Sequence, residues 1–291
     1  PISHPAEYAR DLAAELGRFY TAGMVEDHGA LDNGRIDEAA FLSQCDDAWR
    51  ERERMMSYEL DRFRYGLFFC LFDTPDRIQH MFWRFSEPQH PSHRGRAAVD
   101  MAGAIDDAYR RSDAVISRAM EYADDRTLLI VLSDHGMTSF QRGVHLNTWL
   151  HDHGLLALRD GVKPGEEAGD LLRCVNWSQT NAYALGLSGI YLNLAGRESQ
   201  GIVRQGEVPE VQQNIIAGLQ SLNDHQRGAA PISSVLSREQ LYSGPYAGES
   251  PDLMVNFARG YRVSWSTAMG GVAQGWFEDN ARKWSGDHLV D

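Results

Sequence analysis

Two continuous runs of apolar residues stand out from the mixed pattern of this chain. The first extends from Gly66 to Phe72 and the second from Thr127 to Ser133. Runs of this length without alternating polar residues are typical of strands that are buried on both faces of a parallel sheet. Polar residues follow each run directly, so both predicted strands end at places where a functional site could lie.

Apolar residues recur at helical or alternating spacing through much of the remaining chain. The pattern predicts helices over residues 5–20, 38–63, 75–84, 101–123, 148–153 and 209–222, and shorter strands over residues 155–158, 180–187, 190–194, 232–236 and 253–257. Segments 21–36, 160–170 and 259–275 are rich in Gly and polar residues and predict irregular structure. The β-α-α-β order around the two long runs predicts an α/β fold, with a mainly parallel sheet flanked by helices.

The residues Asp134 and His135 follow the second predicted strand directly. Open α/β sheets place their chemistry at the carboxyl ends of strands. A carboxylate beside an imidazole suits a divalent transition metal, zinc or manganese above all. Gly136 permits the sharp turn that would bring both side chains toward one point. The alternative is an ordinary turn after a strand.

A second pair of candidate ligands follows the first predicted strand. Pro75 is well placed to begin a helix that Thr74 or Asp73 would cap. Asp76 and His80 then stand four positions apart, so they share one helix face and could bind one ion. The alternative is an acidic residue favoured by the helix dipole together with a surface histidine.

A third candidate ligand stands near the end of the sequence, in the stretch Trp284-Ser285-Gly286-Asp287-His288. Gly286 and its short polar neighbours predict a loop, and His288 is the candidate that this loop carries. An isolated histidine is more often a structural or solvated residue than a ligand. On its own, this third stretch is therefore weak evidence for a metal site.

Taken in order, these motifs resemble the alkaline phosphatase superfamily. Within it, the sequence is most similar to the type I phosphodiesterase/nucleotide pyrophosphatase branch and its bacterial group of predicted phosphohydrolases or phosphomutases. The similar stretches are residues 73–84, 133–137, 143–150, 189–194, 251–253 and 284–288. The ordered set is specific, although each stretch alone is not.

The resemblance implies one alkaline phosphatase-like domain over residues 1–291, with an inserted cap or subdomain at about residues 160–270. It implies two divalent metal ions as cofactors, with zinc expected first and manganese as the alternative. By resemblance, the ligands of one ion are Asp76, His80 and His288, and those of the other are Asp134 and His135.

The resemblance also implies a first strand that ends in Asp and a Ser or Thr nucleophile at the start of the next helix. No segment of this sequence matches either feature, so we expect both in residues upstream of Pro1 and assign no nucleophile. The implied activity is hydrolysis of phosphate mono- or diesters through a two-metal site. A phosphomutase and a catalytically incomplete metal-binding chain are the alternatives.

Three further residues could contribute to a site. His145 follows the Asp134-His135 pair by about ten positions and could contact substrate or a ligand. Arg142 could bind a phosphate through two parallel hydrogen bonds, although a solvated arginine is the simpler interpretation. Asp73 could orient a ligand histidine, but a helix cap is the simpler role for it.

Composition limits the partners of this chain. The formal net charge of −13 argues against binding a nucleic-acid polymer but allows a small phosphorylated substrate, because bound metal ions would dominate the local field. Three widely spaced cysteines form no thiolate metal motif and no disulfide framework, which favours the cytoplasm. No apolar run has the ~20 residues of a membrane span. A signal peptide, if one exists, would precede these residues, and the sequence does not indicate an oligomeric state.

Overall fold

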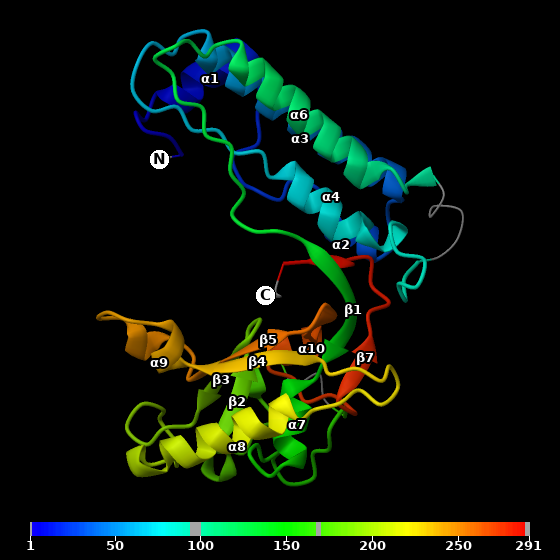
Figure 1. The fold of residues 1–291 in the computed structure, drawn as a ribbon, viewed down its shortest axis with the longest axis vertical. Coiled ribbons are helices and arrows are strands. Elements are labelled where there is room, and N and C mark those ends of the chain that lie inside the picture. The colour runs from blue at the N-terminus through cyan, green and yellow to red at the C-terminus, as the bar shows by residue number, and fades with distance from the viewer. Residues whose placement is uncertain (1, 94–99, 167–169, 289–291) are drawn as a thin grey trace. The chain divides into compact units, whose positions relative to one another are not determined.

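The computed structural model of the protein describes residues 2–93, 100–166 and 170–288. By packing, the chain divides into two compact units (Figure 1). Unit 1 comprises Pro1–Met137 and Arg282–Gly286, and unit 2 comprises Thr138–Ala281 and Asp287–Asp291. The segment Thr138–Ala281 of unit 2 is therefore inserted into the chain of unit 1. The single domain and the cap at about residues 160–270 stay predictions.

Unit 1 is helical in its described part. Its elements are α1 (Tyr8–Leu16), α2 (His28–Asp32), α3 (Glu38–Leu60), α4 (Thr74–Phe82), the 3-10 helix η1 (Trp83–Phe85) and α6 (Ala104–Met120). The four helices predicted before residue 124 are confirmed with shifted ends. The prediction of a loop over residues 21–36 misses α2, because the Asp27 carboxylate accepts the Ala30 N–H and begins a short turn there.

The helices of unit 1 share a small hydrophobic core. Asp37 caps α3, since its carboxylate accepts the Ala40 N–H over 2.8 Å. The apolar face of α4 contributes Phe82, whose ring centroid lies 6.1 Å from that of Phe41 on α3. This core fixes α4, the helix that carries the candidate ligands Asp76 and His80.

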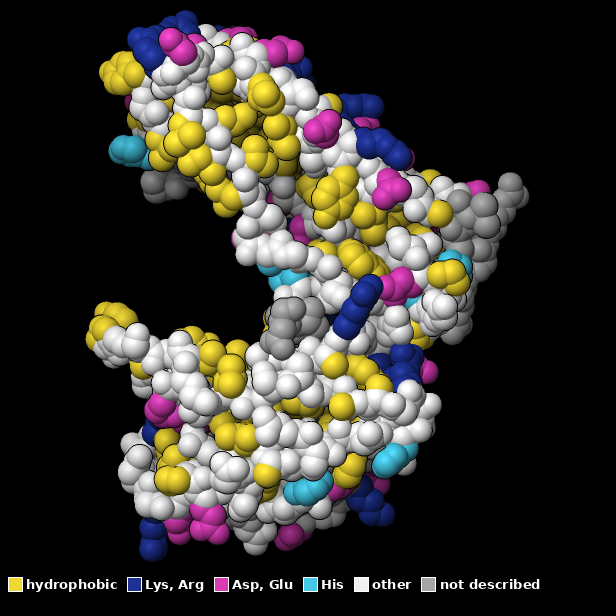
Figure 2. Space-filling model, viewed as in Figure 1, with side chains coloured by type: hydrophobic (Ala, Val, Ile, Leu, Met, Phe, Trp, Pro, Cys, Tyr) yellow, Lys and Arg dark blue, Asp and Glu magenta, His cyan; other side chains and the backbone are white. Residues whose placement is uncertain are grey.

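The two long apolar runs do not form strands, so the prediction of strands over residues 66–72 and 127–133 is wrong for this structure. In the first run, side chains alternate as in a strand: Phe72 packs on Trp49 with ring centroids 5.6 Å apart, whereas Leu67 is 90% exposed. In the second run Leu128 is 82% exposed. Figure 2 shows hydrophobic side chains gathered on the visible face of unit 1.

The physical reason lies in the backbone. A strand needs a neighbour that pairs its N–H and C=O groups. Within the described residues, every strand begins at Thr138 or later, so these runs have no sheet to join. The predicted mainly parallel sheet around them is accordingly not observed.

Unit 2 contains two sheets. One has the order β2 (Ala182–Leu185), β3 (Gly189–Leu192), β5 (Leu253–Phe257) and β4 (Ile232–Ser237), and all its pairings are antiparallel. In the other, β1 (Thr138–Val144) lies between β6 (Gly260–Val263), which is parallel to it, and β7 (Phe277–Asp279), which is antiparallel, and β8 (Gly286–Asp287) also pairs with β1. The α/β class is confirmed, with antiparallel and mixed sheets in place of a mainly parallel one.

Helices cover these sheets and enclose the larger hydrophobic core. They are α7 (Leu146–Asp152), α8 (Val208–Gln220), α9 (Arg238–Leu241) and α10 (Trp265–Ala268), with 3-10 turns η2 (Asp170–Leu172), η3 (Trp177–Gln179), η4 (Gln205–Glu207) and η5 (Ala247–Glu249). The prediction that residues 259–275 are irregular is wrong at β6 and α10. There Ser264 caps α10 by accepting the Thr267 N–H over 3.0 Å.

None of the helices in the described part of the chain combines the length and the hydropathy that crossing a lipid bilayer requires.

The exposure of the second apolar run can be tested against a buried leucine of the same unit. Leu128→Ser should change the free energy of unfolding by less than about 0.5 kcal/mol, as at other surface sites. Leu31→Ala removes a side chain that is 0% exposed and should cost about 2–5 kcal/mol. Urea unfolding of both variants measures the difference. Equal losses would mean that residues 128–132 are buried.

Candidate metal centre

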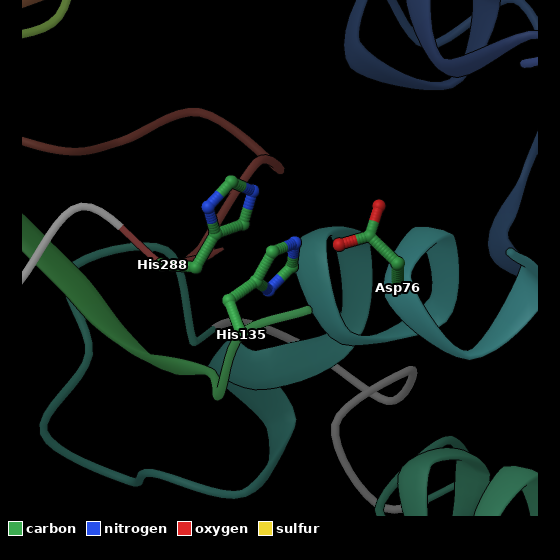
Figure 3. A group of neighbouring side chains, drawn as sticks. All are labelled: Asp76, His135 and His288. Atoms are coloured by element: carbon green, nitrogen blue, oxygen red, sulfur yellow. The ribbon is translucent and has the colours of Figure 1, made fainter. Parts of the chain in front are cut away.

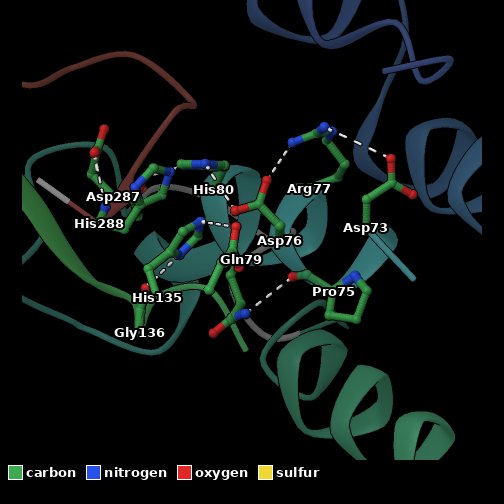
Figure 4. A network of polar contacts seen from close by, with 12 residues as sticks. Asp73, Pro75, Asp76, Arg77, Gln79, His80, His135, Gly136, Asp287 and His288 are labelled. Atoms are coloured by element: carbon green, nitrogen blue, oxygen red, sulfur yellow. Dashed lines mark hydrogen bonds and ion pairs between the residues drawn. The ribbon is translucent and has the colours of Figure 1, made fainter. Parts of the chain in front are cut away.

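The helix α4 presents Asp76 and His80 on one face, as their spacing predicts. The Nε2 atom of His80 lies 3.3 Å from Oδ1 of Asp76 (Figure 4), and His80 is 3% exposed. Pro75 lies in the first turn of the helix, and Asp73 occupies the cap position without a capping side-chain hydrogen bond. The Asp73 carboxylate instead lies 3.9 Å from the guanidinium of Arg77, which also contacts Asp76.

The hydrogen bonds of His80 determine what its Nε2 atom can bind. Its Nδ1 atom lies 2.7 Å from the Gly286 carbonyl oxygen, which can only accept, so Nδ1 carries the proton and donates. In the neutral ring, Nε2 therefore points a lone pair at the Asp76 carboxylate. Two acceptors that face each other need a cation between them, either a proton or a metal ion. A carboxylate and an imidazole Nε2 are also the donor types that zinc and manganese bind, so these residues fit a divalent ion.

The segment Lys283–Gly286, here called the C-terminal clasp, lies along α4 within unit 1. Trp284 packs against the His80 ring in a tilted arrangement, with ring centroids 3.9 Å apart. The Ser285 N–H donates to the His80 carbonyl over 2.7 Å, and Ser285 Oγ accepts the Arg84 N–H over 3.0 Å. The clasp therefore fixes the position and the tautomer of His80 together.

Arg84 is a buried residue beside this site that the sequence analysis missed. It is 2% exposed, and its guanidinium donates to the Lys283 carbonyl over 2.7 Å and to Glu38 over 2.9 Å. Burial lowers the pKa of Arg84 to about 10, although Glu38 works in the opposite direction. Its position four residues after His80 could have revealed it, because that spacing places both side chains on one helix face.

The predicted pair Asp134 and His135 also lies in unit 1. A ring nitrogen of His135 lies within 4.8 Å of a carboxylate oxygen of Asp76, and Figure 3 shows the two side chains directed toward each other. His135 Nδ1 lies 3.0 Å from the Gly136 carbonyl oxygen, so this ring also presents Nε2. Asp134 is 84% exposed, and its Oδ2 lies 3.4 Å from His135 Nε2. The structure thus places His80 and His135 each near Asp76, with Asp134 beside His135.

The remaining predicted ligand, His288, belongs to unit 2 and follows the clasp by two residues. Its backbone N–H donates to the Asp287 carboxylate over 2.8 Å. Two residues of extended chain span about 7 Å, so the His288 Cα stays within that reach of Gly286, whose carbonyl binds His80. Its role as a ligand stays a prediction.

Arg142 lies in an ion-pair network inside unit 2. It is 4% exposed, and its guanidinium donates to Asp224 over 2.5 Å and to Asp279 over 2.8 Å. Tyr261 donates to the same Asp224 carboxylate over 3.1 Å. Arg142 would have to leave these carboxylates to contact a phosphate, so its predicted role in substrate binding gains no support here.

His145 is buried at the start of α7 in unit 2. Its side chain is 3% exposed, its Nε2 lies 3.7 Å from the Glu278 carboxylate, and its Nδ1 has no hydrogen-bond partner among the described residues. Burial lowers the pKa of His145 to about 4, so the ring is neutral at neutral pH. Its predicted role beside substrate or a ligand is not tested by this geometry.

Comparison with known proteins adds one finding. The family described as type I phosphodiesterase / nucleotide pyrophosphatase matches residues 3–283 of the chain. The search of curated proteins and the search of solved structures found no match to this chain.

The close approach of the clasp to α4 depends on Gly286. A Cβ atom at this position would meet the Gln79 carbonyl oxygen at 2.5 Å and Trp83 Cβ at 3.1 Å. Gly286→Ala should therefore force the clasp away from α4 and lower the free energy of unfolding by about 1–3 kcal/mol. Gly248→Ala is the matched control, because a Cβ there meets nothing within 4 Å. Urea unfolding measures the free energy of unfolding of both variants. Equal values would contradict the close approach of the clasp to α4.

The burial of His145 predicts a dependence of stability on pH. Its folded pKa of about 4 lies below the ordinary 6.5, so the unfolded chain binds more protons between these values. The contribution of His145 to the free energy of unfolding is fully present above pH 6.5. It decreases as the pH falls toward 4, by up to about 3 kcal/mol. Denaturant unfolding at pH 7 and pH 4.5 should show a smaller loss for His145→Gln than for the unmodified chain. An equal loss of stability in both proteins would refute the lowered pKa of His145.

Proposed function

Because this chain belongs to the type I phosphodiesterase / nucleotide pyrophosphatase family of the alkaline phosphatase superfamily, we propose that it is a metal-dependent hydrolase of phosphate mono- or diesters. The family is one of hydrolases. The metal dependence, the two-ion site and the substrate class are our proposal for this chain.

The observation that carries the proposal is the environment of Asp76. Within unit 1, the Nε2 of His80 and a ligand atom of His135 both lie close to its carboxylate, at 3.3 Å and within 4.8 Å. Each imidazole uses Nδ1 for a backbone carbonyl, so Nε2 is the nitrogen that faces a carboxylate, that of Asp76 for His80 and that of Asp134 for His135. Arg77 pairs with the same carboxylate and offsets its charge.

We assign Asp76, His80 and His288 to one divalent ion, and Asp134 and His135 to a second, with zinc first and manganese as the alternative. Bound divalent ions would polarise the phosphate oxygens and favour ionisation of the attacking group. The chain itself supplies the negative charge through its carboxylates and orients the His80 imidazole through the clasp. We assign no nucleophile, because no segment of this sequence matches the family's Ser or Thr motif.

The proposed substrate is a small phosphorylated molecule. A formal net charge of −13 repels a long phosphate backbone, whereas two divalent ions would attract a single phosphate group. The same composition, with three cysteines and no disulfide framework, is the ground on which we propose a cytoplasmic location.

Metal binding can be tested at the ligand histidines. His80→Ala should lower the affinity for one ion and leave the other partly bound, because the two ions have separate ligands. His288→Ala should do the same, and His135→Ala should affect the second ion. His151→Ala is the control, since its Nδ1 lies 3.0 Å from the Leu156 carbonyl oxygen at the end of α7. Metal analysis after dialysis, together with zinc titration calorimetry, gives the stoichiometry. Unchanged binding in all three ligand variants would refute the site.

Hydrolysis can be tested with aryl phosphates. Bis(p-nitrophenyl) phosphate reports diester cleavage, and p-nitrophenyl phosphate reports monoester cleavage with release of inorganic phosphate. A chelator should abolish turnover, and added zinc or manganese should restore it. Turnover that the chelator does not change would exclude metal dependence. Transfer of phosphate to another hydroxyl without phosphate release would indicate a phosphomutase, and two bound ions without turnover would indicate a catalytically incomplete chain.

A further inference from the structure

Arg262 is a buried arginine of unit 2 that lies on β6. It is 2% exposed, and its Nη1 donates to Oδ2 of Asp287 over 2.8 Å. Its guanidinium carbon lies 3.9 Å from the ring centroid of Trp265 and 4.7 Å from that of Phe140. Ring contacts of this kind favour the cation and restrict where it can lie. The guanidinium therefore offers Asp287 a donor at a fixed position.

The other oxygen of Asp287 is bound by the next residue of the chain. The backbone N–H of His288 donates to Oδ1 over 2.8 Å. One carboxylate thus joins the side chain of Arg262 to the backbone of His288, and both bonds include a charged group, which makes them stronger than neutral ones. The backbone conformation at His288 is consequently tied to strand β6.

We propose that Arg262 is a positioning residue that acts through Asp287 to hold His288 in the orientation of a metal ligand. This inference rests on the proposed function, in which His288 binds a divalent ion. A buried ion pair is weak evidence for stability, because removing two charges from water is costly. A role in placing His288 gives this costly pair a purpose beyond packing.

Removing the guanidinium should loosen the ligand without removing it. Arg262→Met fills a similar space but removes the hydrogen bond that the guanidinium donates to Oδ2 of Asp287. Partners that orient metal ligands typically affect metal affinity by about 10–100-fold, and we expect a loss in this range. Arg262→Lys keeps a buried cation that can donate to Asp287, so it should recover part of the affinity.

A double-mutant cycle separates this role from a general effect on the fold. The four proteins are the unmodified chain, Arg262→Met, His288→Ala and the double variant. Each is titrated with Co²⁺, and the visible absorption of the bound ion reports both its affinity and its ligand geometry. If Arg262 acts through His288, Arg262→Met should weaken Co²⁺ binding in the presence of His288 and have no further effect in its absence.

Arg238→Met is the matched control. It removes another arginine of unit 2 whose guanidinium donates to a buried carboxylate, that of Asp252, over 2.5 Å. This variant should leave Co²⁺ affinity and the absorption spectrum unchanged. An equal loss in Arg238→Met and Arg262→Met would show a general effect of disturbing unit 2 and would overturn the proposal.

The remaining outcomes are distinguishable. Unchanged affinity and spectrum in folded Arg262→Met, or an equal loss in the His288→Ala background, would overturn the positioning role alone. Failure of the unmodified chain to bind Co²⁺ would instead refute the proposed function. If Arg262→Met does not fold, Asp287→Asn and Arg262→Lys provide the same cycle with smaller changes, and thermal unfolding monitored by circular dichroism verifies each variant.

Discussion

The pair of hydrogen bonds between α4 and the C-terminal clasp determines how this candidate site is built. One bond joins the His80 ring to the Gly286 carbonyl, and the other joins the Ser285 N–H to the His80 backbone. Together they fix the position of the imidazole and determine that Nδ1 carries its proton, so that Nε2 faces Asp76. The buried guanidinium of Arg84 supports the same segment from the next helical turn. The site thus depends on two distant parts of the sequence.

Local patterns in the sequence were sufficient for part of this arrangement. The spacing of Asp76 and His80 predicted a shared helix face, and Pro75 predicted where that helix begins. The family was also predictable, because ordered motifs along the chain carry it. These features rest on helix geometry and on short-range residue order, which a single sequence displays directly.

The remaining features depend on partners that a single sequence does not identify. The run 66–72 has the composition of a buried strand, but composition does not reveal whether neighbouring strands are present to pair with it. The parallel sheet predicted around it failed for that reason. The burial of Arg84 and Arg262 was missed for a related reason. A buried arginine is recognised by the carboxylate or carbonyl that it contacts, and these partners, Lys283 and Asp287, are not sequence neighbours of the two arginines.

The clasp also sets the time at which the site can form in a growing polypeptide. Its contact with His80 joins residues 206 positions apart, and unit 2 up to Ala281 lies between them. A ribosome adds about 5–20 residues per second, so α4 emerges roughly 10–40 s before the clasp is synthesised. During that interval no residue of the clasp orients His80 on the nascent chain. The orientation of His80 that this hydrogen bond fixes can therefore form only after residues up to Gly286 have been synthesised.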